Sequence, residues 1–169
     1  MSAVMSVAVP AESALHPSLA KASFHDAYSA PLSDGALTPT EIFLRTIDAT
    51  PRWVSGLMAI RNRVVRLFGL KDVGSISRGA RKPASAYRIG DPIGIFTIVA
   101  IREDELLLGI DDSHLDVRVA VTKPWGDRSR RYVVSTVVNV HNSMGRAYMV
   151  PVGAIHPFIV RALMRASRV

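Results

Sequence analysis

Gly109-Ile-Asp-Asp-Ser-His-Leu-Asp-Val-Arg-Val-Ala-Val121 is the stretch that decides the fold, because it holds one turn and one clearly patterned strand. Residues 111–113 are Asp-Asp-Ser, which are residue types typical of turns. Residues 114–122 then alternate polar and apolar side chains, as in a strand with one solvated face. Such a strand needs neighbours on its edges and another layer to cover its apolar face.

Further strands are predicted on both sides of this stretch. Apolar, β-branched runs cover residues 93–101, 106–110 and 132–140, and short polar turns separate them. Together with residues 114–122 they predict a four-stranded antiparallel meander. One more strand is predicted over residues 24–30.

Two helices are predicted between the first strand and the meander. Thr38-Pro39-Thr40-Glu41 is a capping box with Pro at the first helical position, so a helix should run from Pro39 to about Ala49. Thr50-Pro51 repeats the cap, and an apolar residue then recurs at helical spacing from Trp53 to Phe68.

A long helix is predicted at the C-terminal end, from about Met144 to Ser167. We expect its apolar positions to share one face that covers the sheet. Pro151 and Pro157 each remove a backbone donor, so the helix should be kinked or divided. The apolar positions are 144, 148, 152, 155, 159 and 163.

Composition indicates one domain with an aliphatic core, since 49% of the 169 residues are hydrophobic and 7% are aromatic. Residues 1–22 lack periodicity and are expected to form a disordered tail before a single domain over residues 23–169. Without cysteine there are no disulfides or thiolate metal sites. We expect no metal and no cofactor, and a cytoplasmic location because no targeting segment is visible.

The net charge of +7 raises the question of acidic partners. Nucleic-acid binding is not favoured, because the few aromatic residues fall mostly at core-like positions and are not free to stack on bases. A solvated basic surface is the simpler interpretation. An anionic membrane surface or a partner protein that meets the basic, apolar final helix is a further hypothesis.

The order of strand, two helices, meander and long helix is that of the helix-grip fold, an α+β arrangement in which a curved antiparallel sheet packs on the last helix. Over residues 24–165 the chain resembles DUF2867, a bacterial family of unknown function. That resemblance implies a relationship to polyketide-cyclase and START-like proteins, and an NAD(P)-binding epimerase-like partner. The motifs that carry it are Pro51-Arg-Trp53, Arg61-Asn62, Gly69-Leu-Lys71, and residues 111–118, 141–148 and 156–161.

His114, Asp116 and Arg118 share one strand face, so they could bind an anionic or polar ligand group. Alternatively, this face is solvated and Asp116 and Arg118 form surface ion pairs. Asp111 and Asp112 could tune each other's pKa values for acid–base work, although turn formation explains them more simply.

The end of the last strand supplies a second group of candidates. His141 and Asn139 lie on one strand face by parity, and would enter a cavity beside Trp53 or Tyr148 if the final helix covers that face. Asn142 is a candidate ligand contact or a helix N-cap. His156, next to Pro157, is expected to bond a carbonyl that the proline frees.

Three functions remain open. The first is binding of a small apolar or amphipathic ligand between the sheet and the C-terminal helix. The second is a cyclase, dehydratase or isomerase that uses a histidine–carboxylate pair, with His141 or His114 as the catalytic candidate. The third is the basic interaction module described above. The residues alone do not establish that the protein is an enzyme.

Overall fold

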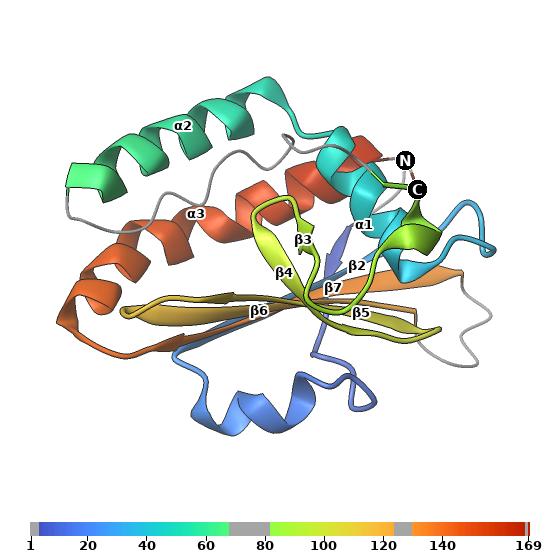
Figure 1. The fold of residues 1–169 in the computed structure, drawn as a ribbon, viewed down its shortest axis with the longest axis horizontal. Coiled ribbons are helices and arrows are strands. Elements are labelled where there is room, and N and C mark those ends of the chain that lie inside the picture. Colours follow the sequence, from blue (N-terminus) through green and yellow to red (C-terminus); the bar gives the residue numbers. More distant parts are fainter. Residues whose placement is uncertain (1–3, 68–81, 124–129, 168) are drawn as a thin grey trace.

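The structure, a computed structural model, describes residues 4–67, 82–123, 130–167 and 169. One curved antiparallel sheet carries the three α-helices on one side (Figure 1). Its strand order is β1-β2-β7-β6-β5-β4-β3. The strands are β1 (Met5–Ser6), β2 (Phe24–Pro31), β3 (Pro92–Ile93), β4 (Phe96–Ile101), β5 (Glu105–Asp111), β6 (Leu115–Thr122) and β7 (Arg131–Val140). The helices are α1 (Pro39–Asp48), α2 (Arg52–Leu67) and α3 (Ser143–Ser167), with short 3-10 helices η1 (His16–Lys21) and η2 (Ala84–Ala86).

This architecture confirms the predicted α+β class and the helix-grip arrangement. The predicted meander is present as β4 to β7, in which consecutive strands pair. The first predicted strand, β2, pairs with β7 and so brings the beginning of the domain beside its end.

We call the sheet face beneath α1 and α3 the inner face, and the opposite one the outer face. The inner face carries the larger core, in which Leu106, Leu108 and Val121 pack with Ile42 and Phe43 of α1. Because side chains alternate along a strand, each strand sends its other residues to the outer face.

The capping box that begins α1 forms as predicted. The Thr38 hydroxyl accepts the N–H of Glu41, and the Glu41 carboxylate accepts the N–H of Thr38. Thr50, in contrast, does not open the next helix, because its hydroxyl donates to the carbonyl of Ile47 at the end of α1. Phe68, the end of the predicted stripe on α2, lies outside the described residues.

Helix α3 is one helix from Ser143 to Ser167 that contains both prolines, so of the predicted kink or division the division does not occur. Its sheet-facing side differs from the prediction, since Met144 and Ile155 of the expected apolar side are exposed. The residues that meet the sheet repeat at steps of three and four: Gly145, Gly153, His156, Val160 and Met164.

Two glycines and a histidine explain why hydropathy alone missed this packing side. A Cβ on Gly145 would collide with the carbonyl oxygen of His114, and Gly153 lies over the Phe24 ring. Close approach to the sheet therefore requires glycine at position 145, whereas a Cβ at Gly153 would make only ordinary contacts. The apolar stripe expected to cover the sheet is partly exposed instead.

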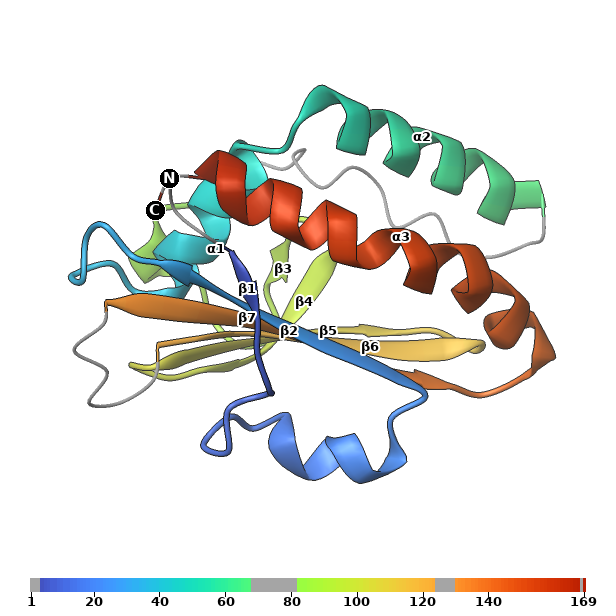
Figure 2. The same ribbon diagram turned by 180° about the vertical axis from the view of Figure 1, so that it is seen from behind.

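The N-terminal segment is also a correction. Residues 4–22 are not a disordered tail, because β1 pairs with β2 at the edge of the sheet and residues 7–22, with η1, pack on the outer face (Figure 2). Leu15 is buried there with Val133 and Val137. The buried Glu105 carboxylate accepts from the Ser13 hydroxyl and the Ala14 N–H. Glu105 lies 91 positions beyond Ala14 in the chain, so the composition of the N-terminal segment could not indicate that it is anchored. Residues 1–3 lie outside the described part of the chain.

Candidate functional site

Polar side chains gather in two places, one on each face of the sheet. The outer-face cluster consists of Asp111, Asp116, Arg118 and His141, and it contains four of the residues singled out in the sequence. The inner-face cluster consists of Asp26, Tyr28, His156 and Arg161, between β2 and α3. The two clusters contain similar residue types but differ in burial.

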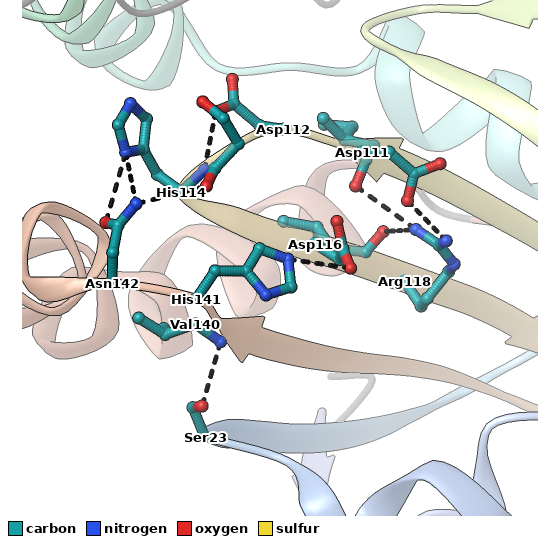
Figure 3. A network of polar contacts seen from close by, with 12 residues as sticks. Ser23, Asp111, Asp112, His114, Asp116, Arg118, Val140, His141 and Asn142 are labelled. Carbon is teal, nitrogen blue, oxygen red and sulfur yellow. Dashed lines mark hydrogen bonds and ion pairs between the residues drawn. The ribbon is translucent and has the colours of Figure 1, made fainter.

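The outer-face cluster is built from two side-chain pairs contributed by β5, β6 and the residue that follows β7 (Figure 3). His141 Nε2 lies 3.0 Å from Asp116 Oδ2. Arg118 Nη2 lies 2.6 Å from Asp111 Oδ1, and the guanidinium also donates to the carbonyl of Val117. The His141 side chain is 42% exposed, so water screens these pairs. Such surface pairs contribute about 0–1 kcal/mol to stability.

The condition under which His141 and Asn139 would enter a cavity, that the final helix covers their face of the sheet, is not met. Asn139 pairs with Asp116 across the β6–β7 ladder, which places both on the outer face. Helix α3 covers the inner face, so Tyr148 on α3 lies on the other side of the sheet, and Trp53 lies on α2, also on the helical side (Figure 1). Strand parity grouped these residues correctly, but it could not say which face the helix covers.

The residues between β5 and β6 form a turn, as the simpler interpretation held. Asp112 Oδ1 accepts the N–H of His114 and the hydroxyl of Ser113. This is the local bonding by which Asp stabilises turns. Asp111 is engaged with Arg118, so the two neighbouring acids serve different partners.

Asn142 is the N-cap of α3 and the partner of His114. Its Oδ1 accepts the N–H of Gly145 at 3.0 Å, and its Nδ2 lies 2.9 Å from His114 Nδ1. His114 Nδ1 also lies 3.2 Å from Asn142 Oδ1, so both polar atoms of the amide are close to this ring nitrogen. His114 is therefore separate from the His141–Asp116 pair, and it links the β5–β6 turn to the start of α3.

The inner-face cluster was not predicted as a site. His156 Nδ1 lies 2.8 Å from Asp26 Oδ2, and both side chains are mostly enclosed. The Arg161 guanidinium carbon lies 5.0 Å from the centre of the Tyr28 ring, a cation–π geometry. The His156 ring also meets Phe24 edge to face, with ring centres 5.6 Å apart.

Two buried atoms of this cluster have no hydrogen-bond partner, Asp26 Oδ1 and Arg161 Nε. One is an acceptor and the other a donor. Leaving a buried polar atom unpaired costs about 1–3 kcal/mol, so such atoms are uncommon in folded proteins. Burial raises the pKa of the Tyr28 hydroxyl, and the Asp26 charge raises it further, whereas Arg161 lowers it.

His156 was expected to bond a carbonyl freed by Pro157, and the structure gives it the Asp26 carboxylate instead. The pairing joins residues 130 positions apart, so no local pattern predicts it. A usable signal was present in β2, where Asp26 interrupts the apolar residues at the inward-facing positions of the strand. A carboxylate at such a position requires a partner from the covering helix.

Neither cluster resembles a metal centre. Within residues 4–67, 82–123, 130–167 and 169, no three histidine or carboxylate side chains gather as possible ligands. The side chains of both clusters can form hydrogen bonds and ion pairs and can transfer protons.

The fold and these clusters define a helix-grip α+β protein with an enclosed polar group beneath its last helix. The family model described as Protein of unknown function (DUF2867) matches residues 18–163, and the chain belongs to that family. None of the curated proteins and none of the solved structures matches the chain.

Proposed function

We propose that the protein binds a small amphipathic molecule between the inner face of the sheet and α3. The observation that carries this proposal is the unpartnered pair of atoms in the inner-face cluster, Asp26 Oδ1 and Arg161 Nε. A ligand whose polar end both donates and accepts hydrogen bonds, such as an alcohol or a primary amide, would complete both. Its binding would remove two desolvation penalties that the free protein carries.

The surroundings of the cluster suit an apolar ligand body. Phe24, Val117 and Val140 belong to the inner face but remain partly exposed, whereas inner-face residues beneath α1 are fully buried. The half of α3 that begins at Ser143 therefore leaves apolar surface of the sheet incompletely covered. Binding sites for small molecules combine such apolar walls with a few placed polar groups.

Three probes with the same apolar tail test this proposal: octan-1-ol, octanoate and octylammonium. Each is titrated into the isotope-labelled full chain, and backbone amide shifts are followed by NMR. We expect octan-1-ol to bind most tightly, with shifts in β2 and in residues 149–161. Asp26→Leu and Arg161→Met should each weaken its binding by about tenfold, which corresponds to about 1.4 kcal/mol.

Asp116→Asn is the matched control, because it changes a carboxylate of the outer face and should leave binding unchanged. Circular dichroism checks that every variant is folded. Shifts that avoid β2 and α3 with all three probes would overturn the proposal. Equal binding by the wild type and both inner-face variants would do the same.

A proton-transfer enzyme is the second candidate, favoured by the His156–Asp26 distance of 2.8 Å. A carboxylate that orients an imidazole is the usual arrangement for a histidine that acts as acid or base. We prefer this pair to His141–Asp116 because it is more enclosed. Mass spectrometry of a bound compound before and after incubation tests turnover. Chemical change that persists in His156→Gln would remove His156 from that role.

The family resemblance supports two further proposals, a relationship to polyketide-cyclase and START-like proteins and association with an NAD(P)-binding epimerase-like domain. The order of elements supports the first, since it is that of the helix-grip fold. Size-exclusion chromatography of the chain mixed with such a domain tests the second. Separate elution at micromolar concentration would count against it.

A further inference from the structure

Helices α2 and α3 carry a charge composition unlike that of the rest of the chain. Neither helix contains an acidic residue. The chain has 21 basic and 14 acidic residues, and seven of the basic ones lie in these two helices, so the remainder is electrically balanced. The formal net charge of +7 thus resides in α2 and α3. The seven are Arg52, Arg61, Arg63, Arg66, Arg146, Arg161 and Arg165.

The same helices expose large apolar side chains. On α3, Phe158 is 67% exposed and Ile155 is 40% exposed, and they share a helix side with Met144 and Pro151. This side lies opposite the residues that meet the sheet. On α2, Trp53 and Ile60 are 49% and 62% exposed, and their spacing places them on one side of that helix.

Both helices lie on the same side of the sheet, with α2 beyond α3 in the two opposite views (Figures 1 and 2). Within the described residues, α3 is also the one helix long and apolar enough to cross a membrane by length and composition. In this fold it does not serve as a span, because Val160 and Met164 are buried and His156 is paired with Asp26 of β2. An apolar helix fixed to a domain in this way suits a position along a surface.

We propose that the side of the protein formed by α2 and α3 docks on an anionic lipid bilayer. The arginines of two helices that contain no acidic residue match anionic headgroups, each worth about 1 kcal/mol near the surface. Exposed Phe158 and Ile155 would enter the boundary between headgroups and acyl chains, as on helices that lie in the membrane plane. Trp53 is of the residue type enriched at this interface. An acidic protein or nucleic acid would use the charge but not this apolar stripe.

Vesicle sedimentation tests the proposal with the full chain. We expect binding to vesicles of equal parts phosphatidylcholine and phosphatidylglycerol, weak binding to phosphatidylcholine alone, and release by high salt. The double variant Ile155→Ser and Phe158→Ser should bind about tenfold more weakly. Arg146→Glu with Arg165→Glu should lose at least about tenfold.

Two single control variants carry changes of the same kind on the outer face. Val99→Ser removes an apolar side chain that is 40% exposed on β4, and Lys21→Glu reverses an exposed charge at the end of η1. Both should bind like the wild type. In a Trp125→Phe background, Trp53 is the single tryptophan and its emission should shift to the blue on vesicle binding.

Three outcomes would overturn docking. They are equal binding to neutral and anionic vesicles, equal losses in the outer-face controls, and binding to heparin or oligonucleotides without binding to vesicles. Unchanged vesicle binding in folded apolar and charge variants of α3 would contradict the surface assigned here. The octan-1-ol titration is independent, because its variants lie between β2 and α3.

Discussion

Glu105 and Asp26 are two enclosed carboxylates on opposite faces of one sheet, and they differ in how well they are satisfied. Glu105 accepts from the Ser13 hydroxyl, the Ala14 N–H and the Thr122 hydroxyl. Asp26 has one oxygen bound to His156 and one buried oxygen without a partner. A carboxylate with a full set of donors is a structural anchor. The incompletely satisfied one is the better candidate for contact with a ligand.

The largest effect is expected for Glu105→Gln. The amide places an N–H group against donors from Ser13 and Ala14, so the free energy of unfolding should fall by about 3 kcal/mol. Urea denaturation measures this loss. Trypsin should then cut faster after Lys21, because residues 4–22 lose their anchor.

Glu103→Ala is the control, since Glu103 is exposed in the same turn and its loss should change stability by less than about 0.5 kcal/mol. A Glu105→Gln variant as stable as this control would break the comparison. The hydrogen bonds of Glu105 would then not anchor the N-terminal segment to the sheet.

Gly145→Ala should have the next largest effect, because the new Cβ meets the carbonyl oxygen of His114 and the Val140 side chain. We expect a loss of about 2–3 kcal/mol in thermal or urea unfolding. Gly153→Ala is the matched control, since its Cβ meets only ordinary contacts beside Phe24. That control should be neutral or stabilise the helix by up to about 1 kcal/mol. Similar losses at both glycines would contradict a close approach specific to Gly145.

Asp26→Asn should cost only about 1–2 kcal/mol, because an amide oxygen can still accept from His156 and the second oxygen has no bond to lose. Urea denaturation beside Glu105→Gln compares the two faces directly. A cost equal to that of Glu105→Gln would show that Asp26 is as well satisfied as the anchor.

The same variant should lower the pKa of Tyr28, because the Asp26 charge is one of the causes that raise it. Ultraviolet titration of tyrosine ionisation follows this change. Since the raised pKa keeps Tyr28 neutral in the folded state, its contribution to stability is present below about pH 10 and is lost at higher pH. Asp26→Asn should reduce that alkaline loss, whereas an unchanged tyrosine titration would separate Asp26 from Tyr28.

The smallest effect is expected for Asp116→Asn, which removes the carboxylate charge that faces His141 on the outer face. The loss should be below about 1 kcal/mol, and high salt should reduce it further. Denaturation at low and high salt measures both. A loss as large as that of Asp26→Asn would show that exposure does not separate the two clusters.

Local patterns in the sequence predicted the elements well. The capping box at Thr38, the meander and the turn at Asp112 all depend on residues close together in the chain, and the structure contains each of them. The bounds of α3 were also predicted closely. The side that faces the sheet was not, because Gly145 lets a less hydrophobic side approach the sheet.

Side-chain contacts between segments far apart in the chain could not be predicted from the sequence. Asp26 with His156 and Ser13 with Glu105 each join distant segments, and only the folded chain brings them together. Strand parity placed Asp116 with Arg118 and His141 with Asn139, but it left open which face α3 would cover. Because α3 covers the opposite face from these residues, the enclosed candidate site lies on the inner face.

The two prolines of α3 have a consequence for motion. Pro151 and Pro157 donate no N–H, so the carbonyls of Ala147 and Gly153 lack their usual helical bonds. The turns between these prolines should open more often than the flanking turns, and their amide hydrogens should exchange faster. That segment includes Gly153 and His156, which lie against β2. The most easily opened part of the helix would then be the part that lies over the polar cluster.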